Sequence, residues 1–298
     1  MKPRHLIVLL LLNICWSATP SAFTYLKDTL SPGGVVTLRF GLAGLMLLAF
    51  WPLFPGKAPR GKDLVLTGLM GLIVFCLGHR LQVYGAQQGS AGNSALLMAM
   101  EPLVTAVGAA VFLREKIHPR SGVGFALGML GVLLLNNIFS PDFKLVGLLP
   151  SLFFVSSFLC ETAFSIMGKG LIERSHFTKV TTLALLIGTA GNVLIDGGET
   201  VRSAANLSFA GWLAILFMAS ICTAVGYVYW FVVIRETDVN IAGLTIFMQP
   251  VAGFLIALLW IGDKPGANHF WGSLTIVCGL VIALWHTREK GSRSQPTG

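Results

Sequence analysis

Apolar residues dominate the chain in runs of about 20, and short polar segments separate these runs. A helix of about 20 residues is long enough to cross the ~30 Å hydrocarbon core of a bilayer. Ten runs are predicted to be transmembrane helices, at about residues 6–26, 34–54, 64–84, 92–113, 121–138, 146–168, 180–196, 209–231, 239–261 and 270–287. No stretch between them is long and polar enough to form a separate soluble domain. The pattern therefore predicts an all-α integral membrane protein.

The composition supports this prediction. Hydrophobic residues make up 54% of the 298 residues and charged residues 11%, whereas soluble domains carry about 25% charged residues. The net charge of +8 does not indicate a nucleic-acid partner, because the basic residues are spread over short loops and form no continuous face. The five cysteines all lie inside apolar runs without metal-ligand spacing. We therefore expect no structural disulfide, no metal site and no cofactor.

Lysine and arginine are distributed asymmetrically between the loops. Most of the 21 basic residues lie at the two termini and in alternate loops. The intervening loops contain Lys27, Lys144, Arg202 and Lys264. Because positive charge accumulates on the cytoplasmic side, this bias predicts a bacterial inner-membrane protein with both termini in the cytoplasm. The first run has a competing interpretation as a cleavable signal peptide, which would leave nine spans.

The chain contains an internal repeat. A shift of 148 residues aligns the third to fifth runs with the eighth to tenth without a gap. The identical aligned pairs include Gly78 with Gly226, Leu96 with Leu244, Met100 with Met248, Pro102 with Pro250, Ala109 with Ala257, Lys116 with Lys264, Gly124 with Gly272 and Gly131 with Gly279. Each half holds five spans, an odd number, so the second half is predicted to cross the membrane in the opposite sense. The predicted domains are two inverted five-helix repeats at residues 1–138 and 146–287, followed by a cytoplasmic tail at 288–298.

Several short motifs follow one another in a fixed order. They are Trp16-Ser17, Leu38-Arg39-Phe40, Met100-Glu101-Pro102, Glu115-Lys116, Met248-Gln249-Pro250 and Asp263-Lys264, with a glycine-rich run after each acidic-lysine step. Their order resembles the EamA family of the drug/metabolite transporter superfamily. The second half departs from the pattern by having Gly262 where the first half has Arg114. The resemblance implies ten helices and alternating access around a central cavity, and it does not specify the cargo.

Two aligned prolines indicate where a transport site could lie. Pro102 and Pro250 fall near the middle of corresponding spans. Each removes a backbone N–H and frees a carbonyl one turn earlier, at Met98 and at Ile246. Paired interruptions of this kind are the best sequence indication of a transport site, although a simple packing kink is the alternative interpretation.

Two carboxyl groups lie deep in predicted spans. Burying a charged carboxyl in a membrane is costly unless it is paired, protonated or hydrated, so Glu101 and Glu161 are functional candidates. Asn93 shares a helix face with Glu101, and Thr245 shares a face with Gln249 in the aligned span. Our hypothesis is that Glu101 binds a proton or a cationic group of the cargo, with Glu161 as the weaker candidate. The alternative is a neutral acid hydrogen-bonded to a neighbouring helix.

Two arginines lie within predicted spans near the outer surface. Arg39 is expected to extend its guanidinium to the lipid headgroups. Arg80 lies in a polar helix end and is a candidate to pair with Glu101 or to bind an anionic part of the cargo. The full set of predicted transport-pathway residues is Trp16, Arg80, Tyr84, Asn93, Glu101, Pro102, Glu161, Tyr227, Thr245, Gln249 and Pro250.

These observations favour a secondary transporter of small metabolites such as amino acids or amines. We expect an exporter, with the proton as a candidate coupling ion. The alternatives are an importer or facilitator, and a channel or sensor that does not transport. The chain has no HExxH, GxSxG or phosphate-binding glycine-rich motif, so we do not expect an enzyme. The expected partners are the small-molecule cargo and the lipid bilayer, and a homodimer is a candidate assembly.

Overall fold

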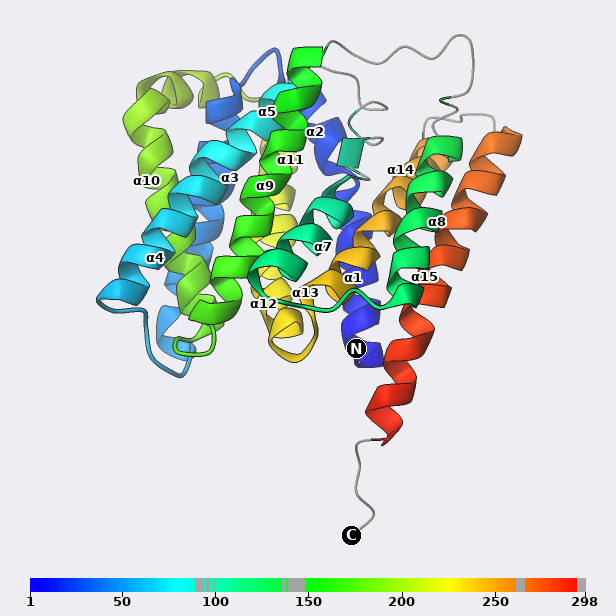
Figure 1. The fold of residues 1–298 in the computed structure, drawn as a ribbon. Helices are drawn as coiled ribbons and strands as arrows, with labels where there is room; N and C mark the ends of the chain where they lie inside the picture. The colour runs from blue at the N-terminus through cyan, green and yellow to red at the C-terminus, as the bar shows by residue number, and fades with distance from the viewer. Residues whose placement is uncertain are drawn as a thin grey trace. The chain divides into compact units, whose positions relative to one another are not determined.

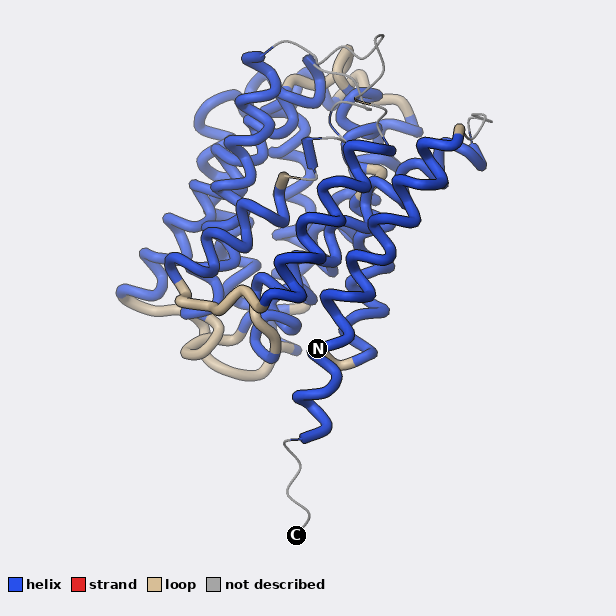
Figure 2. The backbone as a smooth tube through the Cα atoms, turned by 45° about the vertical axis from the view of Figure 1, so that its right-hand side comes forward, coloured by secondary structure: helices blue, strands red, loops and turns tan. Residues whose placement is uncertain are grey.

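The computed structural model describes residues 1–88, 94, 97, 98, 100–135, 138, 148–260 and 266–293 (Figure 1). Within these ranges the chain forms helices joined by short connections, with no strand (Figure 2). Seven helices are long and apolar enough to cross a membrane, at Pro3–Leu26, Pro32–Ala49, Lys62–Gln88, Leu149–Leu171, Phe177–Ala204, Phe209–Glu236 and Ala267–Leu284. Three shorter apolar helices, at Glu101–Phe112, Pro119–Leu135 and Val239–Gly253, fall in the other three predicted spans. The prediction of an all-α, multi-pass membrane protein is confirmed, and the count of ten spans stays a prediction.

The helices form two compact units that interleave along the chain. Unit 1 comprises Met1–Ala18, Gly92–Val146 and Glu236–Gly298, and unit 2 comprises Thr19–Ala91 and Gly147–Arg235.

Unit 2 is built on an aromatic core. Its helical elements are α2 (Thr19–Leu26), α3 (Pro32–Ala49), η1 (Trp51–Leu53), α4 (Lys62–Gly71), η2 (Leu72–Gly78), α5 (His79–Gln88), α9 (Leu148–Leu171), α10 (Phe177–Ala204), α11 (Phe209–Phe217), η3 (Met218–Val225) and α12 (Gly226–Glu236). Helix α3 packs along α10, while α5 and η2 pack along α9. Phe164 of α9 stacks on Phe231 of α12 with ring centroids 4.3 Å apart, and both rings are fully buried. This stacking holds α9 and α12 together.

Local sequence explains where two of these helices begin. Ser31 precedes α3, and its Oγ accepts a hydrogen bond from the Gly34 N–H at 3.2 Å. Ser208 caps α11 in the same way, through the Gly211 N–H at 3.1 Å. A serine at this position satisfies an N–H that has no partner within the helix. Each cap therefore sets the start of a membrane helix in unit 2.

Two segments of unit 2 are wound as π-helix, η2 before α5 and η3 before α12. They lie at aligned positions in the two sequence repeats, because the shift of 148 residues brings Gly78 onto Gly226. A π-turn widens the helix locally and often marks a functional site. His79 directly follows the first wide segment, and Tyr227 lies two residues beyond the second.

Unit 1 contains the remaining helices. They are α1 (Pro3–Trp16), α7 (Glu101–Phe112), α8 (Pro119–Leu135), α13 (Val239–Gly243), η4 (Leu244–Phe247), α14 (Met248–Trp260) and α15 (Ala267–Arg293). Phe125, Phe247 and Ile276 are central members of its buried apolar core. Within this unit, α15 ends at the same end at which α1 begins (Figure 1).

Helices α8 and α15 approach each other closely along a line of four glycines, Gly124, Gly131, Gly272 and Gly279. A Cβ atom added to Gly131 would lie 2.7 Å from the Gly272 carbonyl oxygen, and one added to Gly272 would lie 2.7 Å from the Gly131 carbonyl oxygen. Gly124 and Gly279 face each other in the same reciprocal way. Small residues of this kind allow membrane helices to pack backbone against backbone. The two helices therefore run antiparallel, each presenting glycine to the other.

Replacing Gly131 by alanine is expected to destabilise the protein by about 1–2 kcal/mol, since overpacking forces a tight interface apart. The added methyl would meet Ile276 Cγ1 at 2.6 Å as well as the Gly272 backbone. The matched control is Gly122→Ala in the same helix, where nothing lies within 4 Å of the added atom. Thermal unfolding of both variants in detergent micelles checks the prediction. Equal unfolding temperatures for the two variants would contradict it.

Candidate functional site

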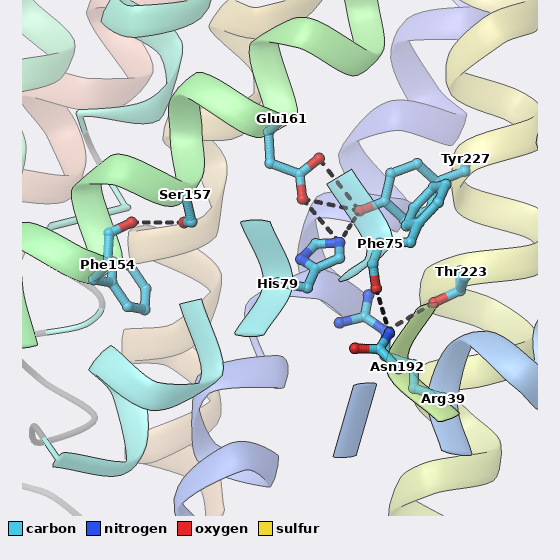
Figure 3. A network of polar contacts seen from close by, with 9 residues as sticks. All are labelled: Arg39, Phe75, His79, Phe154, Ser157, Glu161, Asn192, Thr223 and Tyr227. Carbon is cyan, nitrogen blue, oxygen red and sulfur yellow. Dashed lines mark hydrogen bonds and ion pairs between the residues drawn. The ribbon is translucent and has the colours of Figure 1, made fainter. Parts of the chain in front are cut away.

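Three polar side chains of unit 2 meet inside the membrane helices (Figure 3). His79 begins α5 directly after the first π segment, Tyr227 is the second residue of α12 after the other π segment, and Glu161 comes from α9. The His79 Nε2 lies 2.9 Å from the Glu161 Oε1 and 2.6 Å from the Tyr227 hydroxyl. That hydroxyl donates to the Glu161 carboxylate, 3.1 Å from Oε1 and 3.3 Å from Oε2. We call these three residues the His–Glu–Tyr cluster.

The cluster is sheltered from solvent. The side chains of His79 and Glu161 are 3% and 14% exposed. The His79 ring stacks on Phe40 of α3 at a centroid distance of 4.6 Å, and Phe75 packs edge-on against Tyr227 at 5.1 Å. The His79 Nδ1 is buried and has no hydrogen-bond partner among the described residues. The His79 ring is thus held among aromatic side chains, with its Nε2 hydrogen-bonded and its Nδ1 without a partner among the described residues.

Arg39 lies beside this cluster and is fully buried. Its Nε donates to the Thr223 Oγ1 at 2.8 Å, and its guanidinium lies 5.0 Å from the centroid of the Phe40 ring. The side chain is 3% exposed, so the expectation that it extends to the headgroups is wrong. The sequence indicates how deep Arg39 lies along its span. It does not indicate the direction of the side chain, which points inward because α3 packs on η3. Its positive charge acts electrostatically on the Glu161 carboxylate.

A second polar cluster joins α5 to α10. The Arg80 Nη2 lies 2.6 Å from the Asp196 Oδ1, and the Arg80 Nε donates to the Asn192 Oδ1 at 2.6 Å. The Asn192 amide in turn donates to the Phe75 carbonyl at 2.8 Å. Asp196 has non-helical backbone angles inside α10, φ −146° and ψ 24°, so the helix bends where the carboxylate meets the arginine. Arg80, selected from the sequence as a candidate for the cargo or for Glu101, is therefore held by an ion pair with Asp196.

Unit 1 contains its own buried polar cluster, formed by Asn13, Thr245 and Gln249. The Asn13 amide donates to the Leu9 carbonyl at 2.8 Å and to the Thr245 Oγ1 at 3.1 Å, and it accepts from the Gln249 Nε2 at 2.8 Å. All three side chains are buried, and the Gln249 Oε1 has no partner among the described residues. The sequence predicted the shared face of Thr245 and Gln249, and the structure adds Asn13 from α1.

The two aligned prolines lie at helix starts. Pro250 is the third residue of α14 and follows the 3₁₀ segment η4, which contains Ile246. Proline has no N–H to donate to the carbonyl of Ile246 one turn earlier, and the chain is wound as a tighter 3₁₀ helix at that point. Pro102 is the second residue of α7, where its missing N–H would have no helical partner in any case. Both prolines thus mark places where helical winding starts anew.

The remaining predicted residues are Glu101, Trp16, Tyr84 and Asn93. Glu101 is the first residue of α7 and is half-buried, and Trp16 is the last residue of α1. Tyr84 packs edge-on against Phe153 with ring centroids 5.4 Å apart. Asn93 lies outside the described residues.

The sequence reasoning missed four residues that the structure places in the clusters: Asn13, His79, Asn192 and Asp196. Each is polar and lies within or at the end of an apolar run, which was the available signal. His79 and Tyr227 carried a further signal, because the repeat shift of 148 residues aligns them.

The motif residue Glu115 binds the start of α13. Its carboxylate accepts hydrogen bonds from the Val239 N–H at 2.9 Å, the Asn240 N–H at 3.0 Å and the Asn240 side-chain amide at 2.9 Å. The residue in the capping position, Asp238, makes no side-chain cap. A carboxylate is stabilising at a helix start because the free N–H groups there carry partial positive charge. Glu115, in the connection between α7 and α8, therefore caps α13 in place of a residue next to that helix in the sequence.

Replacing Glu115 by glutamine is expected to lower the free energy of unfolding by about 1–2 kcal/mol, because charge-assisted bonds to N–H groups are lost. The control is Glu199→Gln, which changes an exposed carboxylate in α10. Denaturant unfolding in micelles would measure both variants. A Glu115 variant as stable as the Glu199 control would show that water replaces these bonds without cost.

Buried polar clusters between the helices of a multi-pass membrane protein are typical of substrate and ion pathways. The model of the EamA-like transporter family matches residues 4–137 and again residues 148–285. The chain belongs to this family, and it is a membrane transporter, not an enzyme.

Two relatives and one solved structure illustrate the similarity. The "Probable amino-acid metabolite efflux pump" of Escherichia coli (strain K12) is 24% identical over 308 residues, which cover 97% of each chain. The "Uncharacterized transporter YyaM" of Bacillus subtilis (strain 168) is 24% identical over 289 residues, covering 95% of this chain and 94% of its own. A crystal structure with 15% sequence identity matches with a TM-score of 0.74 over 97% of this chain and 99% of its own, so it shares the fold.

Proposed function

We propose that the protein is a secondary transporter that exports small metabolites such as amino acids or amines across a bacterial inner membrane. The observation that carries this proposal is the match of both chain halves to the EamA-like transporter family. The similarity along nearly the whole chain to a relative named as a probable amino-acid metabolite efflux pump supports export and the cargo class.

The proposed architecture is two inverted five-helix repeats. The contacts between α8 and α15 support it, because they are reciprocal: Gly124 faces Gly279, while their aligned counterparts Gly272 and Gly131 face each other. A self-complementary contact of this kind is characteristic of two elements related by a two-fold axis. Since the helices are antiparallel, such an axis would lie in the membrane plane, as in inverted repeats.

The proposed orientation has both termini in the cytoplasm. The distribution of lysine and arginine supports it, as does the finding that α1 begins and α15 ends at one end of unit 1. The proposed transport-pathway residues remain those predicted from the sequence. In this proposal Glu101 is the candidate to bind a cationic group of the cargo, as its depth in the span suggests.

Transport by purified protein in proteoliposomes tests the proposal. Liposomes preloaded with an unlabelled amino-acid mixture are placed in medium with one radiolabelled amino acid or amine at a time. A transporter exchanges the label in a saturable manner, whereas empty liposomes and liposomes with heat-denatured protein do not. Ion conductance without saturation would instead indicate a channel and would refute the proposal.

A further inference from the structure

We propose that the His–Glu–Tyr cluster of unit 2 is the proton-binding site through which this transporter uses a proton gradient. The inference rests on the proposed transport function and adds to it the residues that carry the coupling ion. It assigns this role to His79 and Glu161, with Tyr227 as the residue that positions them.

The hydrogen-bond pattern defines which protons the cluster holds in this conformation. A carboxylate only accepts hydrogen bonds, so the Tyr227 hydroxyl donates to Glu161 and its oxygen is left to accept from the His79 Nε2–H at 2.6 Å. The same Nε2–H faces the Glu161 Oε1 at 2.9 Å. With a neutral imidazole and an ionised carboxylate, the His79 Nε2, the Tyr227 hydroxyl and the Glu161 carboxylate are then all hydrogen-bonded. The unsatisfied atom is the buried His79 Nδ1.

An additional proton has two places to bind, and each changes the charge balance of the cluster. On Nδ1 it would make the imidazole a cation whose Nε2 lies 2.9 Å from the Glu161 carboxylate, and it would create a buried N–H that faces no acceptor among the described residues. On the Glu161 carboxylate it would remove the negative charge that faces the buried guanidinium of Arg39. Binding a proton should therefore favour a different arrangement of the helices. This is the differential affinity for two conformations that coupling requires.

Further charged or titratable groups belong to the elements packed around the cluster. They include Arg39 of α3, Cys76 of η2, Arg80 of α5, Cys160 of α9, Asp196 of α10, Cys222 of η3 and Tyr227 of α12. Arg80 and Asp196 neutralise each other in the ion pair described above. Arg39 and Glu161 thus supply opposite charges near the His79 imidazole, which contacts the Glu161 carboxylate directly.

The cluster also connects helices that follow π-helical segments. It joins α5, α9 and α12, and two of these helices begin directly after π-helical segments. A π segment holds an extra residue in its turn, and changing that winding rotates the residues that follow. Proton binding at His79 can in this way be transmitted to α5 and α12 together. The proton would enter from water on one side of the membrane and leave to water on the other.

Two measurements on the full-length protein in lipid test this inference. The variants are His79→Gln, Glu161→Gln and Glu161→Asp, with Glu199→Gln as the exposed control. The first measurement compares two assays. One is exchange of a transported amino acid, which needs no gradient. The other is accumulation driven by a gradient of about one pH unit, which can raise the concentration ratio by at most about tenfold per coupled proton. The second records infrared difference spectra between about pH 5 and about pH 8, the range in which histidine titrates.

We expect His79→Gln to retain exchange but to lose the accumulation and its pH dependence. Glu161→Gln should also lose the accumulation and its pH dependence, and Glu161→Asp should recover part of both. The infrared bands of a titrating imidazole and carboxylate should be absent from the corresponding variants and unchanged in Glu199→Gln. Wild-type accumulation in both neutral variants would overturn the inference, as would unchanged infrared bands. Loss of the pH dependence in Glu101→Gln alone would transfer the role to Glu101. Absence of exchange by the wild type would refute the transport function, and the infrared spectra would still decide whether the cluster binds the proton.

Discussion

Replacing Arg39 by methionine is expected to lower the free energy of unfolding by about 3 kcal/mol and to abolish transport. Methionine fills most of the same space, so the loss reflects the interactions of the guanidinium and not a cavity. Those interactions are the hydrogen bond to Thr223, the cation–π contact with Phe40 and the electrostatic balance with Glu161. In a buried site each of these is stronger than it would be in water.

Two further variants separate these contributions. Arg39→Lys keeps the charge but loses the planar fork that reaches Thr223 and stacks on the ring, so it should restore stability only in part. The double variant Arg39→Met/Glu161→Gln removes both charges and should be more stable than Arg39→Met alone. Chemical unfolding in micelles checks both comparisons. An Arg39→Met protein as stable as the wild type would show that the guanidinium is hydrated and not part of the buried network.

Replacing Asp196 by asparagine should destabilise the protein by about 2–3 kcal/mol, because it leaves Arg80 without its counterion in a largely buried place. The Arg80 and Asp196 side chains are 22% and 14% exposed, so solvent screens part of the effect. The control is Glu199→Gln, which neutralises an exposed carboxylate on the same helix.

The double variant Arg80→Gln/Asp196→Asn distinguishes the two roles considered for Arg80. Removing both charges should recover most of the stability measured by thermal unfolding. If the arginine serves the ion pair alone, transport should recover as well. A stable double variant that does not exchange amino acids would show that Arg80 also binds the cargo, and an Asp196→Asn protein as stable as its control would refute the structural role.

The sequence was sufficient to locate the helices, because length and apolar content alone determine what crosses a bilayer. It could not locate their internal breaks. The π segments η2 and η3 lie within runs that are predominantly apolar. Periodicity shows no signal there, since a helix that is apolar on every side lacks a distinguishable face. Winding changes of this kind depend on packing against neighbouring helices.

The sequence indicated several of the polar residues of the candidate site, but not which residues they contact. The cost of a charged group in lipid selected Glu161, while the internal repeat selected Tyr227 and Gln249. The structure places all three side chains in buried clusters. Their partners come from distant segments, such as Asn13 for Gln249 and His79 for Glu161. A single sequence contains no record of which faces meet, so these pairings required the packed structure.

The meeting of His79 with Tyr227 shows what divergence of a duplicated helix can achieve. The two residues occupy aligned positions in the halves of the chain, yet they differ in chemistry. Two histidines there would repel each other once both were protonated, and two tyrosines would hold their protons until about pH 10. One residue of each kind instead brings an imidazole and a phenol together. A contact between two aligned positions of the repeat thereby becomes chemically asymmetric, which it would not be with the same residue on both sides.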